Sequence, residues 1–289
     1  MAGVYGIIAK RNMIIEKWLK LAKQKISALD AELIALVGLA EILPVGVDRS
    51  YIFAHQDTEI SQKHQDMLDE MLARRVRGEP LAYILGFREF YGRNFVVNKA
   101  VLIPRPETES LVELAKGLDL PYRPRFVEVG TGSGCIAITL ALEFPQAEVL
   151  AIDAYVKALD VAAENNLRLE GRVHLVQSNL LRDLSLPEDV REFDVLVANL
   201  PYVDPNWDWL DADGLAFEPK TALFAAKEHG LSFYKRLLRE LRNGHVLNVR
   251  YLIFEADPCQ HEELVEFVGK KGYDLARIDG YGLLFEKRK

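Results

Sequence analysis

The stretch Asn199-Leu200-Pro201-Tyr202 places an amide, a proline and an aromatic ring directly after an apolar run that is predicted to be a buried strand. The side-chain oxygen of Asn199 and the backbone carbonyl of Leu200 could each accept one N–H bond from a planar amino group. Such bonds would aim the acceptor's lone pair at an electrophile and stabilise positive charge developing on nitrogen. Pro201 stiffens the turn, and the Tyr202 ring could stack on the acceptor. The predicted chemistry is group transfer to an amide or aryl amine.

A glycine-rich turn is predicted directly after an earlier strand. Its residues are Gly130, Thr131, Gly132, Ser133 and Gly134. Glycines let the backbone turn tightly, so a ligand could lie against bare main chain. A dinucleotide fingerprint, G-x-G-x-x-G, would need glycine where Cys135 stands, and the turn is therefore a poor cradle for a pyrophosphate. A purely structural tight turn is the alternative for these residues taken alone.

An acidic residue accompanies the glycine turn. Asp153 ends the next predicted strand, nineteen positions after Gly134, where a carboxylate could accept hydrogen bonds from both ribose hydroxyls of a nucleoside. Its alternative role is to cap the following helix. A glycine-rich turn followed by a carboxylate that could bind ribose, without the G-x-G-x-x-G pattern of a pyrophosphate site, resembles the S-adenosylmethionine site of Rossmann-like methyltransferases. In that resemblance Asn179 and Leu180 flank the adenine, although many such enzymes have an acid where Asn179 stands.

Methyl transfer from a sulfonium is an in-line displacement, in which the main task of the protein is positioning. Open α/β sheets bind ligands at the carboxyl ends of their strands. Asn199 ends the fourth predicted strand, on the same rim as Gly130 and Asp153, and is therefore expected to face the cofactor as well as the acceptor. No Cys/His spacing suggests zinc, and no metal is expected.

The elements that must position these residues fall into two parts. Up to about residue 80 the apolar residues recur at helical spacing, which predicts a small helical domain. One predicted helix has an inward face of Ile15, Trp18, Leu19, Ala22 and Ile26. Asp30 and Ser61 are predicted to cap two further helices. Residues 87–103 are aromatic and β-branched with a turn signal at Gly92, which predicts a β-hairpin.

Strands and helices alternate from Phe126 onward. This alternation predicts a doubly wound, mostly parallel sheet. The predicted strands lie at 126–130, 148–152, 173–177, 193–198, 251–256 and 283–287, and the predicted helices lie at 135–144, 155–169 and near 231–242 and 260–271.

Several longer stretches resemble, in order and spacing, the peptide chain release factor glutamine methyltransferases. They are "RRVRGEPLAYILGFREFYG", "VLIPRPETE", "EVGTGSGCIAI", "NLPYV" and "FEPKTALFAAKEHGLSFYKRLL". The resemblance implies an α/β fold: a Rossmann-like seven-stranded methyltransferase sheet with an N-terminal helical domain and a β-hairpin linker. The domains expected are residues 1–85 for substrate recognition, 86–103 for the linker and 104–289 for S-adenosylmethionine-dependent methyl transfer.

The resemblance also implies an activity and a partner. Members of this family methylate the side-chain N5 of the glutamine in the Gly-Gly-Gln motif of class-I peptide chain release factors, with S-adenosylmethionine as cofactor and S-adenosylhomocysteine as product. Asn199, Leu200, Pro201 and Tyr202 match the glutamine-binding motif, in which Asn199, Pro201 and Tyr202 are the expected catalytic residues. The cofactor positions matched are Gly130 to Gly134, Asp153, Asn179, Leu180 and Asn199.

The stretch "PRPETE" supplies two further candidates. Arg105 and Glu107 are expected to border the entrance of the acceptor and to contact substrate. The alternative is that acids at the start of a helix only complement the helix dipole.

Three departures from the family pattern stand out. Leu200 replaces the first proline of N-P-P-Y, and it keeps an N–H that proline lacks, so this donor must find a partner or water. Asn179 replaces the family acid, although an amide can still bond to the adenine edge. The chain also ends on "DGYGLLFEKRK", which differs from the usual charged ending.

Two other functions compete. The spelling N-L-P-Y resembles the rRNA adenine dimethyltransferases, which makes an rRNA or other nucleic-acid amino-methyltransferase the main alternative. In that family the glycine loop lies near the N-terminus and the helical domain follows it, whereas here about 125 residues precede the loop. A non-catalytic cofactor-binding scaffold is the third hypothesis, which loss of Asn199 or Asp153 would have favoured.

The overall balance of charge also bears on the partner. The chain has 289 residues and a formal net charge of −7, and we expect no stable nucleic-acid binding because a general binder usually has a basic footprint. Two distant cysteines suggest a reduced compartment, and no apolar stretch is long enough to span a membrane. A cytoplasmic monomer is expected.

Residues 1–26 differ from this acidic average. Their basic residues are Lys10, Arg11, Lys17, Lys20, Lys23 and Lys25, against Glu16 alone. A solvated helix face is the ordinary explanation, and a surface for the partner is the alternative.

Overall fold

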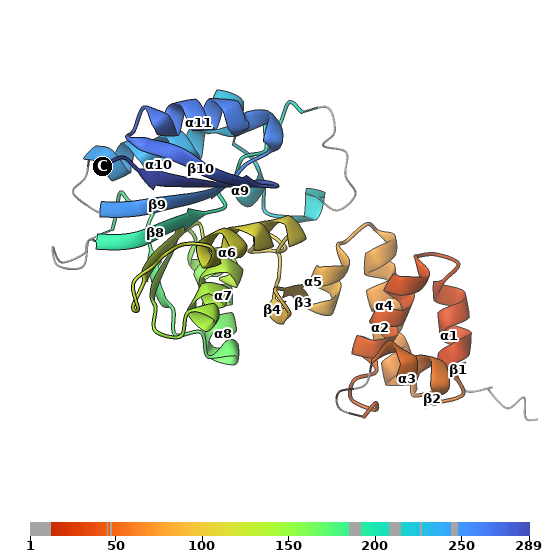
Figure 1. Ribbon diagram of the computed structural model, residues 1–289. Helices are drawn as coiled ribbons and strands as arrows, with labels where there is room; N and C mark the ends of the chain where they lie inside the picture. Colours follow the sequence, from red (N-terminus) through yellow and green to blue (C-terminus); the bar gives the residue numbers. More distant parts are fainter. Residues whose placement is uncertain are drawn as a thin grey trace, which may run out of the picture. The chain divides into compact units, whose positions relative to one another are not determined.

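The computed structural model describes residues 13–44, 46, 48–184, 192–207, 215–225, 227–243 and 248–289, and its ribbon is drawn in Figure 1. The chain divides into two compact units, Met1–Leu85 and Gly86–Lys289. Lys10 and Arg11 of the basic run lie outside the described residues.

The first unit is helical, as predicted. Its elements are β1 (Met13–Ile14), α1 (Ile15–Ala22), α2 (Ala28–Gly38), α3 (Arg49–Ala54), β2 (Glu59–Ile60), α4 (Gln62–Val76) and α5 (Leu81–Leu85). The inward face predicted for α1 is confirmed for Ile15, Trp18, Leu19 and Ala22, which are buried in the core of this unit. Ile26 lies beyond the end of α1 and is only partly buried. Apolar residues at a period near 3.6 leave one face of the helix for the core.

Hydrogen bonds at the helix ends correct one predicted cap and confirm the other. Ser61 caps α4, because its hydroxyl accepts the N–H of His64. The predicted cap at Asp30 is wrong: Ser27 caps α2 by accepting the Asp30 N–H, and the Asp30 carboxylate instead accepts a bond from Arg75 at 2.7 Å. The helix begins at Ala28, so Asp30 lies inside its first turn, where an acid complements the helix dipole, and Ser27 holds the capping position.

The second unit contains a seven-stranded sheet. Its strands are β5 (Arg125–Val129), β6 (Glu148–Asp153), β7 (His174–Gln177), β8 (Glu192–Ala198), β9 (Asn248–Glu255), β10 (Tyr273–Asp279) and β11 (Gly282–Lys287). Their order across the sheet is β10-β11-β9-β8-β5-β6-β7. The strands from β9 to β7 run parallel, and β11 is antiparallel to both of its neighbours. The predicted mostly parallel sheet is confirmed.

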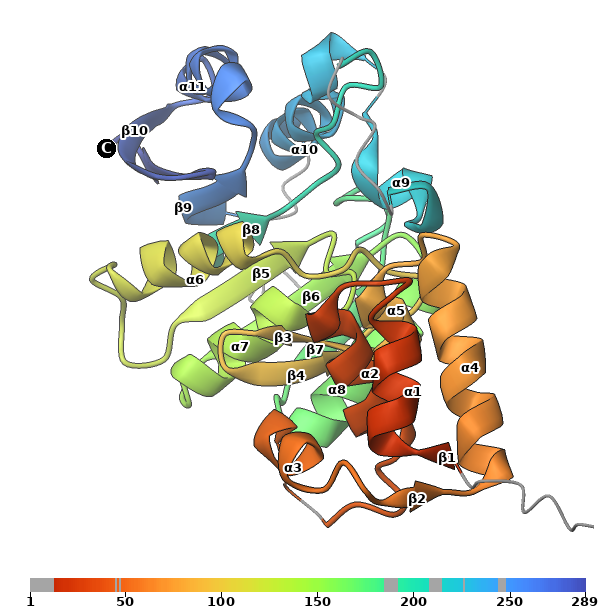
Figure 2. The same ribbon diagram turned by 90° about the vertical axis from the view of Figure 1, so that its right-hand side faces the viewer.

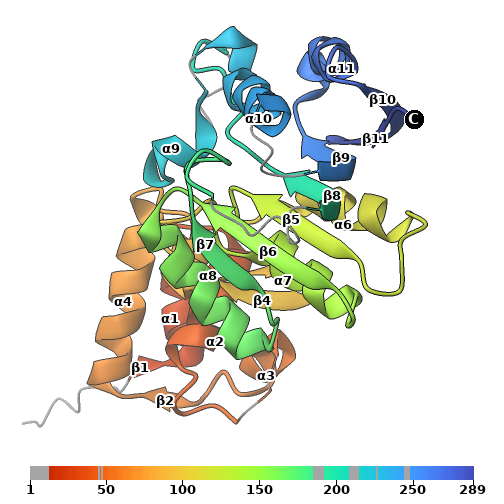
Figure 3. The same cartoon turned by 90° about the vertical axis from the view of Figure 1, so that its left-hand side faces the viewer.

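Helices cover both faces of this sheet. One face carries α6 (Glu109–Lys116), α7 (Cys135–Glu143) and α8 (Val156–Leu169), and the other carries α10 (Ser232–Asn243) and α11 (His261–Gly269), as Figures 1 and 3 show. Each layer has its own apolar core against the sheet. Strands buried on both faces must be apolar throughout, which explains uninterrupted runs such as Val195 to Ala198.

The predicted hairpin is formed by β3 (Phe87–Phe90) and β4 (Arg93–Val96) and belongs to the second unit. Phe90 and Phe95 are buried in the core that α6 and α7 share with the sheet, and Figure 2 shows the hairpin beside α7 and α8. The side chain of Asn165 on α8 bonds both the N–H and the C=O of Val96, at 2.7 and 3.0 Å. An amide that pairs with a free strand edge fixes the hairpin to the helix layer.

Short helical turns complete the second unit. They are η1 (Pro106–Thr108), η3 (Leu215–Phe217), α9 (Lys220–Leu223), η4 (Glu228–Gly230) and η5 (Pro258–Gln260). Within the described residues no helix is long and apolar enough to cross a bilayer. Because β5 to β9 are parallel, their carboxyl ends share one edge of the sheet, and the predicted site residues follow these ends.

Candidate active site

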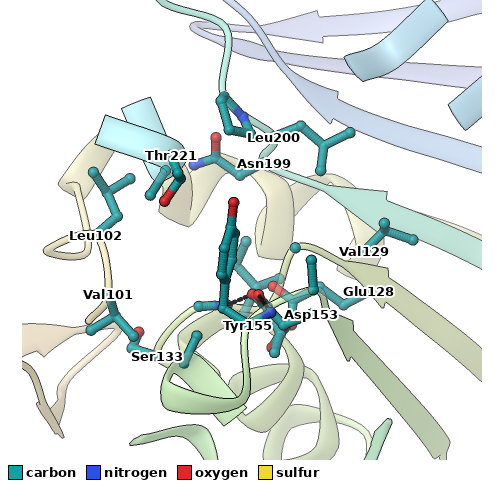
Figure 4. Close-up of a pocket in the computed structure, with 18 of the residues that line it drawn as sticks. Val101, Leu102, Glu128, Val129, Ser133, Asp153, Tyr155, Asn199, Leu200 and Thr221 are labelled. Atoms are coloured by element: carbon teal, nitrogen blue, oxygen red, sulfur yellow. Dashed lines mark hydrogen bonds between the residues drawn. The ribbon is translucent and has the colours of Figure 1, made fainter. Parts of the chain in front are cut away.

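A cavity of about 230 Å³ lies at the carboxyl ends of β5, β6 and β8. We call it the Asp153 cavity. Its lining includes Arg105, Glu128, Gly130, Thr131, Gly132, Ser133, Asp153, Tyr155, Asn179, Leu180, Asn199, Leu200 and Pro201. The fold therefore brings together residues that the sequence places up to about a hundred positions apart (Figure 4).

A second cavity of about 280 Å³, the Tyr202 cavity, lies on the other side of the N-L-P-Y motif. It is lined by Glu107, Tyr202, Glu255, Asp257 and Tyr281, among others, and it shares Arg105, Asn199, Leu200 and Pro201 with the Asp153 cavity. Three residues of the motif thus form a wall common to both cavities. A ligand in one cavity would meet a ligand in the other at Asn199.

The glycine-rich turn adopts a backbone conformation that leaves little room for side chains at Gly130 and Gly134. Gly130 and Gly134 have φ of +81° and +82°, a region that residues with a Cβ rarely adopt. A Cβ on Gly130 would lie 2.9 Å from Leu200 Cδ2, and one on Gly134 would lie 2.8 Å from Ile138 Cδ1. Gly132 has open space where its Cβ would stand. The turn thus packs tightly on the motif and on α7 while it leaves its middle residue facing free space.

The carboxylate of Asp153 is held rigidly by the backbone. Its Oδ2 accepts the N–H of Gly132 and its Oδ1 accepts the N–H of Tyr155, each at 2.9 Å. Burial raises the pKa of Asp153, and these backbone bonds oppose the increase. Each oxygen keeps a lone pair for a further donor. Support for the start of α8 and acceptance of ligand hydroxyls are therefore compatible roles for one carboxylate.

Glu128 is an acid at the end of β5 that the sequence patterns do not single out. Its side chain is buried, and its Oε2 accepts bonds from the Thr131 hydroxyl and from the Ala137 N–H. Its buried Oε1 has no hydrogen-bond partner in the described part of the chain, and burial raises the pKa of this carboxyl to about 8. An orphaned acceptor that lines a cavity would be satisfied by a cationic or N–H-bearing ligand.

The charges that line the Asp153 cavity favour a cationic ligand over a phosphate. Arg105 and Arg236 are the cationic side chains in the described lining. Arg105 bonds Glu218 at 2.5 Å, and Arg236 bonds Glu240 at 2.7 Å, so both are neutralised by acids. Together with the carboxyl of Asp153, this lining fits a nucleoside that carries positive charge and no phosphate.

An aromatic ring also stands in the cavity. Figure 4 shows the Tyr155 side chain projecting between Ser133 and Asn199. Tyr155 is 52% exposed although it follows a buried strand, and an exposed aromatic side chain can stack on a planar base. Leu180, by contrast, is buried, with φ of +57°. The signal for Tyr155 in the sequence is an aromatic residue two positions after the candidate ribose acid.

Hydrogen bonds from neighbouring elements fix the N-L-P-Y motif. The N–H of Leu200, the donor that a proline would lack, bonds the Tyr234 hydroxyl at 3.0 Å. Asn199 Nδ2 donates to Thr108 Oγ1 at 3.1 Å, and the Tyr202 hydroxyl donates to Glu255 Oε1 at 3.1 Å. These partners come from α10, η1 and β9, and the motif is therefore held on three sides.

The backbone that leaves the motif is clamped as well. The carbonyl of Tyr202 accepts a bond from Gln260 Nε2 at 2.8 Å. Gly230 lies directly behind it, where a Cβ would stand only 2.0 Å from the Tyr202 oxygen. Only glycine allows this close approach.

Arg105 and Glu107 both lie at the site, at different places. Arg105 lines both cavities and pairs with Glu218, whose Oε2 also accepts the N–H of Ile103. Glu107 lines the Tyr202 cavity alone. Among the described residues no group of three His, Cys, Asp or Glu side chains could hold a metal ion.

The strand order with one antiparallel strand, the glycine turn after β5 and the acid at the end of β6 define a Rossmann-like methyltransferase. A "Methyltransferase domain" family matches residues 126–212, and a "PrmC N-terminal domain" family matches residues 17–86. A methyltransferase structure from Pyrococcus furiosus shares the fold, with a TM-score of 0.50 at 18% identity over 76% of this chain and 100% of that chain.

Curated relatives are more similar. The release factor glutamine methyltransferase of Koribacter versatilis is 43% identical over 76% of each chain. That of Escherichia coli is 35% identical over 84% of this chain and 87% of its own. The chain belongs to the release factor glutamine methyltransferase family.

The buried carboxyl of Glu128 leads to a prediction about pH. Because its pKa is raised from the usual 4.5 to about 8, the folded state holds a proton that the unfolded state has released, and stability falls as pH rises through this range. Glu128→Gln cannot ionise and keeps an oxygen for Thr131 and Ala137. We expect the free energy of unfolding of this variant, relative to wild type, to be higher at about pH 8.5 than at about pH 5.

Urea unfolding of the protein without ligand at both pH values measures this difference. Glu164→Gln, at an exposed position on α8, is the matched control and should show no such trend. A Glu128→Gln difference that is constant with pH would show that the carboxyl is already ionised at pH 5 in the folded protein.

Proposed function

We propose that this protein transfers the methyl group of S-adenosylmethionine to the side-chain amide nitrogen of the glutamine in the Gly-Gly-Gln motif of class-I peptide chain release factors. Membership of the release factor glutamine methyltransferase family supports the reaction and the substrate. The observation that carries the proposal is the position of Asn199, Leu200 and Pro201 as the common wall of two cavities. A methyl donor and a methyl acceptor require such adjoining sites.

The Asp153 cavity suits the cofactor. Asp153 would accept the ribose hydroxyls, and the unpartnered oxygen of Glu128 would face the cationic part of the molecule. Tyr155 would cover the base, with Asn179 and Leu180 along its edge. S-adenosylmethionine, when bound, supplies a methyl group that a sulfonium activates for displacement.

The N-L-P-Y motif would hold the acceptor. The side-chain oxygen of Asn199 and the carbonyl of Leu200 would each accept one N–H of the glutamine amide, while the Tyr202 ring packs on its plane. An amide nitrogen is a poor nucleophile because its lone pair is delocalised, so fixing its direction is the main contribution to rate. The bond between the Leu200 N–H and Tyr234 holds the peptide that presents this carbonyl.

Leu200 in place of proline is compatible with this role. The acceptor contact uses a backbone carbonyl, which either residue supplies, and Pro201 restricts the preceding residue to extended conformations. The Tyr234 hydroxyl takes up the additional N–H. The alternative acceptor, an amino group of rRNA, is supported only by the residue sequence N-L-P-Y of the motif. The names of the curated relatives favour the release factor.

We propose that the first unit contacts the release factor through the basic face of α1 and the turn that follows it. Lys17, Lys20 and Lys25 are exposed there. Lys23 belongs to a structural pair, because its ammonium bonds the buried Glu32 at 2.8 Å, and Arg49 bonds the same carboxylate. We further propose that the enzyme works as a monomer, since both cavities are lined by residues of one chain.

Asp153→Ala should weaken the binding of S-adenosylmethionine. Hydrogen bonds to a charged group contribute on the order of 1.5–3 kcal/mol each, so affinity should fall by at least about tenfold. Isothermal titration calorimetry measures the effect, and Asp153→Asn, which keeps the shape of the side chain, separates charge from packing. Unchanged affinity in a folded Asp153→Ala variant would show that Asp153 does not bind the cofactor.

Asn199→Ala should lower turnover much more than it lowers affinity for the release factor, because its contact strengthens as charge develops on nitrogen. We expect a loss of turnover on the order of 10²-fold or more, as for the loss of one preorganised contact to the transition state. Steady-state methyl incorporation into the release factor provides kcat and KM. Turnover within a few-fold of wild type, in a variant that still binds cofactor, would contradict the role of Asn199.

Changing Lys17, Lys20 and Lys25 to glutamate should slow association with the release factor and flatten its salt dependence, because charge near an interface steers the encounter. Changing Lys270, Lys287 and Lys289 of the second unit alters the net charge equally and is the matched control. Surface plasmon resonance at several salt concentrations measures both. Equal kinetics for the two triple variants would show that the α1 face is only solvated surface.

A further inference from the structure

A buried carboxyl stands behind the N-L-P-Y motif. Glu255 ends β9, lines the Tyr202 cavity and is 1% exposed. Its Oε1 accepts the Tyr202 hydroxyl at 3.1 Å, and its backbone carbonyl accepts the Tyr234 hydroxyl. Among the described residues its buried Oε2 has no hydrogen-bond partner. A buried carboxylate oxygen is a strong acceptor, so a donor close by is expected to serve it.

Thr108, at the end of η1, is the neighbour that can serve it. This residue is 2% exposed, and its Oγ1 accepts a hydrogen from Asn199 Nδ2 at 3.1 Å. A hydroxyl that accepts on oxygen still has its own proton to donate. Burial raises the pKa of Glu255, whereas the side chains of Thr108, Tyr202 and Asn199 lower it by facing the carboxylate with hydrogen-bond donors. The nitrogen end of the Asn199 amide is therefore directed toward Thr108 and Glu255.

We propose that Glu255 and Thr108 are positioning residues that decide which end of the Asn199 amide faces the methyl acceptor. A carboxylate can only accept, so the Thr108 hydroxyl donates to Glu255. The Thr108 oxygen is then left to accept from Asn199 Nδ2, and Asn199 Oδ1 faces the acceptor. The direction of the whole chain of hydrogen bonds follows from the charge on Glu255. This inference rests on the proposed function, because it concerns the acceptor contact of the same motif.

The direction matters because the two ends of an amide have nearly the same shape and opposite hydrogen-bonding character. With Oδ1 toward the acceptor, Asn199 accepts an N–H and aims the nitrogen lone pair. With Nδ2 toward the acceptor, two NH₂ groups face each other and neither has a partner. Without a fixed direction, part of the population would hold the unproductive arrangement, and turnover would fall in proportion.

Glu255→Gln tests the direction without changing the shape. The Tyr202 hydroxyl needs an acceptor, so the glutamine oxygen should stay at the position of Oε1, and its NH₂ group should replace Oε2. That group donates to Thr108, whose hydroxyl would then donate to Asn199 Oδ1 and turn the amide around. We expect kcat for release factor methylation to fall by about tenfold or more, with KM and cofactor affinity changed by less than about threefold.

Thr108 provides a second route to the same test. Thr108→Val keeps the volume and removes the hydroxyl, and kcat should again fall by roughly tenfold. Thr108→Ser returns the hydroxyl and should recover most of the lost turnover. Thr139→Val is the matched control: Thr139 is a buried threonine on α7 whose hydroxyl has no partner among the described residues, and this variant should keep the wild-type kcat.

A double-mutant cycle distinguishes positioning from a structural role. If Thr108 acts only through the Asn199 amide, Thr108→Val should have no further effect on kcat once Asn199 is alanine. If Thr108→Val lowers kcat equally in both backgrounds, or if Thr108→Ser restores nothing, the positioning role is wrong. Loss of cofactor binding would reveal a Thr108 variant that does not fold. In that case the result for Glu255→Gln decides whether the positioning role holds.

The result for wild type separates this inference from the proposed function. If the wild-type protein does not methylate the Gly-Gly-Gln glutamine at all, the proposed function itself fails. If wild type is active and Glu255→Gln and Thr108→Val both match Thr139→Val in kcat, only the positioning inference is overturned.

Discussion

The hydroxyl of Tyr234 is the contact on which the geometry of the site depends. It is fully buried on α10, accepts the N–H of Leu200 at 3.0 Å and donates to the backbone carbonyl of Glu255. It thereby connects the residues that follow β8 with the last residue of β9. The turn after β8 carries the wall that both cavities share, and the end of β9 carries the acid behind that wall. Parallel strands bring these ends to one edge, and a hydroxyl that both accepts and donates sets the spacing between them.

Charge then separates the tasks of the two cavities. In the Asp153 cavity the arginines are neutralised by Glu218 and Glu240, and the carboxyl of Asp153 would face a cationic nucleoside. In the Tyr202 cavity the carboxyl of Glu255 is deeply buried, and under the proposal above it would act on the acceptor through Thr108 and Asn199. One acid would thus bind the cofactor and another would orient an amide. The same residue type serves both purposes because its surroundings differ.

Much of this arrangement could be predicted from the sequence. The apolar runs, the glycine turn and Asp153 predict the parallel sheet and its ligand edge, because strands buried on both faces and turns at positive φ leave local patterns. Strand β10 has no such local pattern in the sequence. Most of its side chains are exposed at the edge of the sheet, so it lacks an apolar run. Glu128, Glu255 and Tyr234 were missed for a different reason. Each looks like an ordinary residue of a strand or helix, and its role comes from partners far away in the sequence. The partner of the Asp30 carboxylate, Arg75, is likewise 45 residues away in the sequence.

The central claim is that the motif between the two cavities directs a methyl group to a glutamine amide. The most direct measurement is to incubate the protein with isotope-labelled S-adenosylmethionine and a purified class-I release factor, and to locate the label by mass spectrometry. Protein-free rRNA and a release factor with the Gly-Gly-Gln glutamine replaced by alanine are treated in parallel. The label should appear on the side-chain nitrogen of that glutamine and on neither control. Robust labelling of rRNA adenine, with none on the glutamine, would contradict the account.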